Sequence, residues 1–192
     1  MKMAKASPED LDMALETMRV SLVAYDSPSY AGSTNWGGYP KEMPWTGMRD
    51  QGHHMMFINF LNQLLKHHSD PELEKLAGQH VDFIMHRFFN PDYGIVNENL
   101  HHDYSRIEGF EDYMYIGHTL EIQWMVMFEA LRTGNRALFD TCAANIRRNL
   151  SLTQGLIMSE RVMLALAARG MGRQEAHEIL RRAAGEVLSG QA

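Results

Sequence analysis

The chain has 192 residues, with 24 acidic and 18 basic side chains, so its formal net charge at neutral pH is −6. This composition lacks the basic footprint of a nucleic-acid-binding protein, and no apolar run is long enough to cross a membrane. The amino terminus has no signal-peptide core, and the single cysteine, Cys142, cannot form an internal disulfide, so we expect a cytoplasmic protein.

Helix signals dominate the first ninety residues. Ser7, Pro8 and Asp10 form a capping signature that starts a helix, and Pro28 ends this segment. Residues 29–48, rich in glycine, proline and aromatic side chains, are predicted as a loop. A second helix covers about 50–67, a third begins at 69–72 and reaches residue 88, and a turn follows at 90–94.

Residues 95–116 follow neither the helical nor the strand period, so they are predicted as a long polar and aromatic loop. Inert connections tend to be short, and a loop of this length is more often functional. Four further helices are predicted at about 117–133, 136–149, 155–169 and 173–188, and no strand is predicted. The fold class is therefore all-α, built of antiparallel α/α hairpins with loops gathered at their ends.

The segment Gly117-His118-Thr119-Leu120-Glu121-Ile122-Gln123-Trp124 contains the main candidate for chemistry. On a helix, the three-residue spacing puts His118 and Glu121 on one face, and Trp124 lies near the same stripe. A histidine that titrates near neutral pH beside a carboxylate can transfer protons. The same pair can equally be a satisfied structural contact.

Residues 35–149 resemble the N-acylglucosamine 2-epimerase family. The resemblance rests on Asn35-Trp36-Gly37-Gly38-Tyr39, on the turn Phe88-Phe89-Asn90-Pro91-Asp92-Tyr93-Gly94, and most of all on the Gly117-His118-x-x-Glu121-x-x-Trp124 motif. It implies an (α/α)6 barrel that moves a proton between C1 and C2 of an aldose through an enediolate, without a cofactor. The implied partner is a small-molecule sugar.

Carried over by position, the resemblance makes His118 the catalytic proton carrier and Glu121 its orienting partner. Arg49 would hold sugar oxygens, and His54 would reach the pocket from its helix. Tyr104 and Trp124 are the aromatic candidates for stacking on the sugar ring.

The predicted helices amount to about half of a complete (α/α)6 toroid, so helix faces that normally pack on neighbours would be exposed. Either the chain forms a homodimer that rebuilds a core, or it packs differently. The competing interpretation is a non-catalytic helical module, or a fusion whose catalytic half is missing.

Residues 152–188 resemble the carboxy-terminal helices of the adenylosuccinate lyase branch of the fumarase/aspartase superfamily. The segment from Gly155 to Ala167, followed by Gly170-Met171-Gly172-Arg173-Gln174-Glu175-Ala176-His177-Glu178, carries this likeness. The S-S-x-M-P-x-K-x-N catalytic loop of that superfamily does not occur in the chain, so its chemistry is not carried over. We therefore predict an epimerase-like helical domain at 1–149 and a helical hairpin at 150–192, with a lyase-like fragment as a third interpretation.

Metal binding is not predicted. The adjacent histidine pairs at 53–54, 67–68 and 101–102 point to different sides of a helix, and no H-E-x-x-H spacing occurs. His118 and Glu121 would supply two ligands at most.

Overall fold

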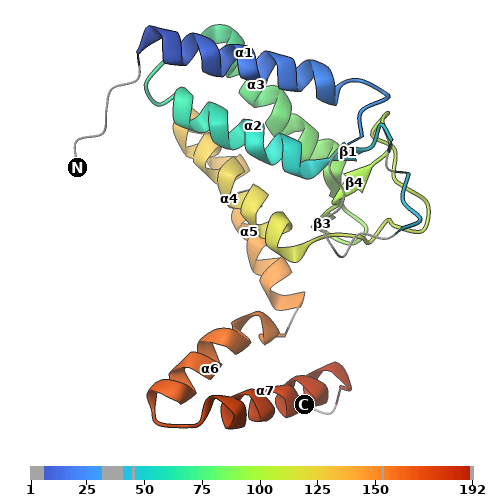
Figure 1. The fold of residues 1–192 in the computed structure, drawn as a ribbon, viewed down its shortest axis with the longest axis vertical. Helices are drawn as coiled ribbons and strands as arrows, with labels where there is room; N and C mark the ends of the chain where they lie inside the picture. The colour runs from blue at the N-terminus through green and yellow to red at the C-terminus, as the bar shows by residue number, and fades with distance from the viewer. Residues whose placement is uncertain (1–6, 32–40, 45, 153, 191–192) are drawn as a thin grey trace. The chain divides into compact units, whose positions relative to one another are not determined.

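The computed structural model describes residues 7–31, 41–44, 46–152 and 154–190. The described residues form seven α-helices and four two-residue strands, so the predicted all-α fold is confirmed (Figure 1). The barrel-like arrangement stays a prediction, and the motif at 35–39 lies outside the described residues. Contacts divide the chain into two compact units, residues 1–143 and 144–192. The assignment of an epimerase-like and a lyase-like domain stays a prediction.

The first three helices begin at side chains that cap their free N–H groups. In α1 (Pro8–Tyr25), the Ser7 hydroxyl accepts from the Asp10 N–H, and the Asp10 carboxylate accepts from the Ser7 N–H. Asp50 caps α2 (Gln51–Leu64), and Asp70 caps α3 (Pro71–Asp82). The chain continues from α3 into a π-helical segment, η1 (Phe83–Phe88). These capping residues fix where each helix starts, and α1 ends before the predicted Pro28.

Helix α2 lies between α3 and α4 (Ile116–Thr133) and packs against both (Figure 1). On one side it joins α1 and α3 in a cluster formed by Met18, Phe57, Leu61, Leu65, Leu73 and Ala77. On the other side it joins η1, α4 and the start of α5 (Arg136–Leu152) in a cluster formed by Met55, Ile58, Ile84, Phe88, Val96, Leu100, Ile122, Met125, Val126 and Cys142. The apolar residues of α2 therefore serve two cores.

Short strands that the sequence did not predict occur directly before α2 and in the segment after η1. Strand β1 (Arg49–Asp50) pairs antiparallel with β4 (Asn99–Leu100), and β2 (Phe89–Asn90) pairs antiparallel with β3 (Ile95–Val96). The expectation of no strand is wrong because two-residue strands are too short to show an alternating pattern. Asn97 is buried between them and donates from its amide to the Glu111 carbonyl at 2.7 Å. The polar loop is therefore partly an internal, hydrogen-bonded segment.

The second unit contains a helical hairpin of α6 (Ser159–Ala168) and α7 (Arg173–Leu188), preceded by a short turn, η2 (Leu156–Met158). Among its described residues, only Asn149 and Ala176 are buried. Large apolar side chains are exposed on this unit, namely Leu150, Leu152, Ile157, Met158, Val162, Leu164, Ile179 and Leu188. The hairpin by itself buries little of its own apolar surface.

Candidate functional site

His118 lies in the first turn of α4, and its Nδ1 is 2.7 Å from Oε1 of Glu98. The imidazole side chain is 39% exposed, whereas the Glu98 side chain is completely buried. Glu98 Oε2 accepts a hydrogen bond from Nε2 of Gln51 at 2.8 Å, and the Gln51 backbone N–H donates to the Glu98 carbonyl at 3.0 Å. The buried carboxyl group of Glu98 therefore contacts one nitrogen of the His118 ring, and another part of the same ring is exposed to solvent.

Burial raises the pKa of the Glu98 carboxyl, and the hydrogen bond from Gln51 partly opposes this shift. When it is ionised, this carboxyl accepts a hydrogen bond from the facing Nδ1–H and leaves the lone pair of the ring on Nε2. The arrangement of buried carboxyl, imidazole and surface is suited to general acid/base chemistry.

The structure gives His118 a different carboxylate from the one that the sequence predicts. The hydrogen-bond partner is Glu98, which precedes it by 20 residues, and not Glu121 one turn further along α4. Side chains three apart share a helix face, but the polar loop brings a closer carboxylate to the ring. Trp124 is 40% exposed and packs edge-to-face on Phe128, with ring centroids 5.4 Å apart. Trp124 therefore lies on the surface of α4 and not beside the other predicted substrate contacts.

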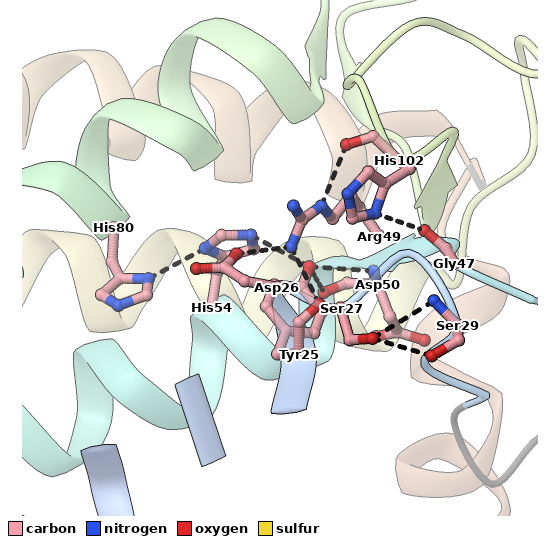
Figure 2. Close-up of polar contacts among 10 residues, drawn as sticks. All are labelled: Tyr25, Asp26, Ser27, Ser29, Gly47, Arg49, Asp50, His54, His80 and His102. Carbon is pink, nitrogen blue, oxygen red and sulfur yellow. Dashed lines mark hydrogen bonds and ion pairs between the residues drawn. The ribbon is translucent and has the colours of Figure 1, made fainter. Parts of the chain in front are cut away.

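Arg49 is buried and its guanidinium is occupied by the protein itself (Figure 2). It donates to the Tyr25 carbonyl at 3.0 Å, to the His102 carbonyl at 3.1 Å and to Asp26 Oδ1 at 2.8 Å. The guanidinium carbon lies 4.9 Å from the centre of the Tyr25 ring and 5.0 Å from that of Tyr104. Arg49 connects the end of α1, strand β1 and the 101–104 loop, which is a structural role rather than the predicted contact with sugar oxygens.

His54 forms a buried polar chain with two residues that the sequence did not single out (Figure 2). Its Nε2 lies 3.1 Å from the Tyr25 hydroxyl, and its Nδ1 lies 2.9 Å from Nδ1 of His80. The Tyr25 hydroxyl also accepts from the Asp50 N–H at 3.1 Å and lies 3.1 Å from the Asp50 carbonyl oxygen. One buried chain therefore links α1, α2 and α3.

Burial keeps this chain uncharged. It lowers the pKa of His54 well below its ordinary value and the pKa of His80 to about 4, and it raises the pKa of Tyr25. Both imidazoles are therefore neutral at physiological pH.

An open cleft of about 530 Å³ lies beside this chain. Tyr25, His54 and His80 line it together with Phe83 and Tyr104, which stack with ring centroids 4.8 Å apart. Two of the predicted substrate contacts, His54 and Tyr104, thus share one cleft, and Arg49 lies behind the Tyr104 ring. His118, Glu121 and Trp124 do not line it.

The cleft and the His118 pair are connected through the start of α2. Asp50 contacts Tyr25 on the cleft side, and the next residue, Gln51, contacts Glu98. The predicted site residues did not include Glu98, Gln51, His80 or Tyr25. The only available signal was the polar Asn97-Glu98-Asn99 run in the predicted loop, and the sequence does not reveal that all three residues are buried.

No group of three or more histidine, cysteine, aspartate or glutamate side chains suited to a metal ion occurs in the part of the chain that the structure describes. Likewise, none of the helices formed by the described residues has the length and apolar character needed to span a membrane.

Comparison with known proteins finds similarity in the C-terminal segment. Residues 155–191 match a family model described as the adenylosuccinate lyase C-terminus. An adenylosuccinate lyase of Methanocaldococcus jannaschii is 68% identical over 40 residues, which is 21% of this chain and 9% of that protein. One from Pyrococcus horikoshii is 49% identical over 63 residues, covering 32% of this chain and 14% of that protein.

A third relative, the adenylosuccinate lyase of Thermotoga maritima, is 25% identical over 122 residues. The match covers 64% of this chain and 23% of the relative, and because it is longer than the second unit it extends into the first. The chain thus spans about a tenth to a quarter of the length of these relatives.

The expectation of a sugar epimerase or isomerase is wrong, because the proteins to which this chain is similar are lyases. The motif around His118 gave a wrong prediction of the family, because a short helical pattern of histidine and glutamate recurs in unrelated folds. The comparisons connect residues 155–191 of this chain with the C-terminal region of adenylosuccinate lyases.

Proposed function

We propose that this chain is a lyase-like fragment whose C-terminal hairpin is an assembly element that packs against the hairpin of a second copy. The observation that carries this proposal is the exposure of large apolar side chains on the segment that matches the lyase C-terminus. The matching segment is only 9% of the M. jannaschii lyase. In that protein, the remaining residues are available to cover the apolar side chains of the segment.

The apolar surface of α6 follows the helical period. Met158, which precedes the first residue of α6, and Val162 and Ala165 within the helix are four and three residues apart, so they form a stripe along it, and all three are exposed. Met158 is 50% exposed and Val162 44% exposed. A contiguous apolar stripe in water favours association, and pairing two stripes removes both from solvent.

Size-exclusion chromatography with light scattering tests the assembly. We expect the full chain to have twice the 22.0 kDa mass of one chain, and Val162→Glu to shift it to the monomer. Gln174→Glu adds the same charge at an exposed polar position of α7, away from the apolar residues of the hairpin, and should leave the dimer intact. A monomeric wild type, or a Val162→Glu variant that remains dimeric, would contradict the proposal.

A second candidate function is favoured by the 2.7 Å contact between the half-exposed His118 and the buried Glu98. We propose that His118 is a general base in a lyase-type elimination. A proton on a substrate carbon passes to Nε2, its C–H electrons form a double bond, and the leaving group departs with its own bonding pair. Glu98 orients the ring through its contact with Nδ1 and so holds the base in position for proton transfer, which general acid/base catalysis requires.

Consumption of adenylosuccinate, the substrate in the relatives' name, tests this second candidate. We expect His118→Asn to lower kcat/KM by roughly 10²–10⁴-fold, with a smaller loss for Glu98→Gln, which keeps the shape of the side chain. Glu121→Gln, on the same helix, is the matched control and should have little effect. Inactivity of the wild type, or equal losses in all three variants, would exclude His118 as the base.

A further inference from the structure

The cleft beside α1 and α3 is a second site that the proposed functions do not use. Its apolar lining comes from the aliphatic side chains of Leu22 and Leu76 and from the rings of Phe83 and Tyr104. A volume of about 530 Å³ lies within the range of small-molecule sites. Apolar walls with a few polar groups are typical of such sites.

The charges around the cleft cancel. Asp26 is paired with Arg49 at 2.8 Å, and the rim carries Lys75 and Asp82, which have opposite signs. An ion of either sign would meet a like charge as well as an opposite one. The lining therefore favours a neutral ligand.

His80 provides the polar group of the cleft. Its side chain is buried, lines the cleft and stacks on Phe57, with ring centroids 4.9 Å apart. Nδ1 of His80 is engaged with His54, whereas Nε2 is buried and has no hydrogen-bond partner among the described residues. Buried polar atoms are normally paired, so this nitrogen requires an explanation.

The hydrogen-bond chain decides whether this nitrogen carries a proton. When the Tyr25 hydroxyl donates to the Asp50 carbonyl, it can accept from both the Asp50 N–H and the His54 Nε2–H. His54 Nδ1 then accepts from His80 Nδ1–H, so His80 Nε2 is a bare lone pair. The opposite order would give Tyr25 one hydrogen bond fewer and bury an unpaired N–H, which is rarer in proteins. The order with a bare Nε2 is therefore favoured.

We propose that the cleft binds a neutral aromatic molecule that donates one hydrogen bond, from an N–H or O–H group, to Nε2 of His80. The aromatic body occupies the apolar part of the cleft, and the donor satisfies the buried lone pair. Because Nε2 is fully buried, this binding requires the side chains that line the cleft to move locally and admit the donor.

Calorimetric titration with indole and with 1-methylindole tests the donor. The two probes share shape and apolarity, but only indole has an N–H. We expect indole to bind about tenfold more tightly, because one net hydrogen bond corresponds to roughly that factor. Binding of indole should also move the side-chain 15N resonance of His80 Nε2. Equal affinity for the two probes, or no binding of indole, would overturn the proposal.

A cleft-filling variant tests the location without endangering the fold. Gly78 lies in α3 and lines the cleft, and a Cβ atom added there meets no atom within 4 Å. Gly78→Leu should fill the cleft, favour the helix and reduce indole binding at least tenfold. Gly185→Leu, at an equally open glycine of α7, is the control and should bind indole like the wild type. Unchanged binding by Gly78→Leu would place the indole elsewhere and refute the proposal.

Discussion

Replacing Arg49 by methionine tests whether this residue is structural or available to a ligand. Arg49→Met keeps a long side chain but removes the hydrogen bonds to the carbonyls of Tyr25 and His102. Hydrogen bonds from a charged donor contribute about 1.5–3 kcal/mol each. The ion pair with Asp26 adds at most about 1 kcal/mol because Asp26 is solvent-exposed. We therefore expect a loss of about 4 kcal/mol, a large share of an ordinary domain's ~5–15 kcal/mol.

Urea unfolding followed by tryptophan fluorescence measures this loss in the first unit alone, because all three tryptophans lie before residue 143. Arg19→Met is the matched control, since Arg19 is exposed on α1 and, among the residues that the structure describes, forms an ion pair only with the exposed Glu16. A loss below about 1 kcal/mol for Arg49→Met would refute the structural role, since lone surface ion pairs contribute that little.

Three further predictions concern stability and reactivity. Gly78→Ala should raise the free energy of unfolding by about 0.5–1 kcal/mol in urea titrations, because it removes backbone freedom at an open helix site; a loss of stability would contradict the open site. The pKa of His80 is lowered by burial to about 4, so the unfolded chain binds its proton first. The free energy of unfolding should therefore be highest above pH 6.5 and should decrease, by on the order of 3 kcal/mol, as the pH drops towards 4. A His80→Phe variant should lose less stability over the same pH range. Burial raises the pKa of the Cys142 thiol to about 12, so a thiol reagent at pH 8 should label the unfolded protein but not the native protein. Rapid labelling of the native protein would contradict this prediction, because it would require an accessible thiol.

Much of the fold was readable from local patterns. The capping residues Ser7 and Asp70 and the helical spacing of the apolar side chains indicate the helices, because both signals act within a few residues. The strand pairs were not readable, since Arg49 and Leu100 form a ladder across 51 positions, with only two residues in each strand. Such pairing depends on long-range contacts that leave no local period.

The site was only partly predictable for the same reason. His54 and Tyr104 were identified and do line one cleft, but their neighbours Tyr25 and His80 come from two other helices. His118 was identified from its helix, whereas its carboxylate partner, Glu98, comes from the predicted polar loop, 20 residues earlier in the chain. Whether a polar residue is buried depends on how the rest of the chain covers it.

The sequence by itself determined the helical class, the starts of the main helices and the likeness of the last forty residues to lyases. Each of these depends on short-range spacing or on residue identity along the chain. Only the tertiary structure decided that Glu98 rather than Glu121 meets His118, that Arg49 is occupied by the carbonyls of its own chain, and that His54 reaches His80. Each of these pairs joins segments that are distant in the sequence, and the packing of α2 between two cores brings these segments together. Buried polar groups form hydrogen bonds with whichever partners folding places next to them, so the partners cannot be read from the sequence.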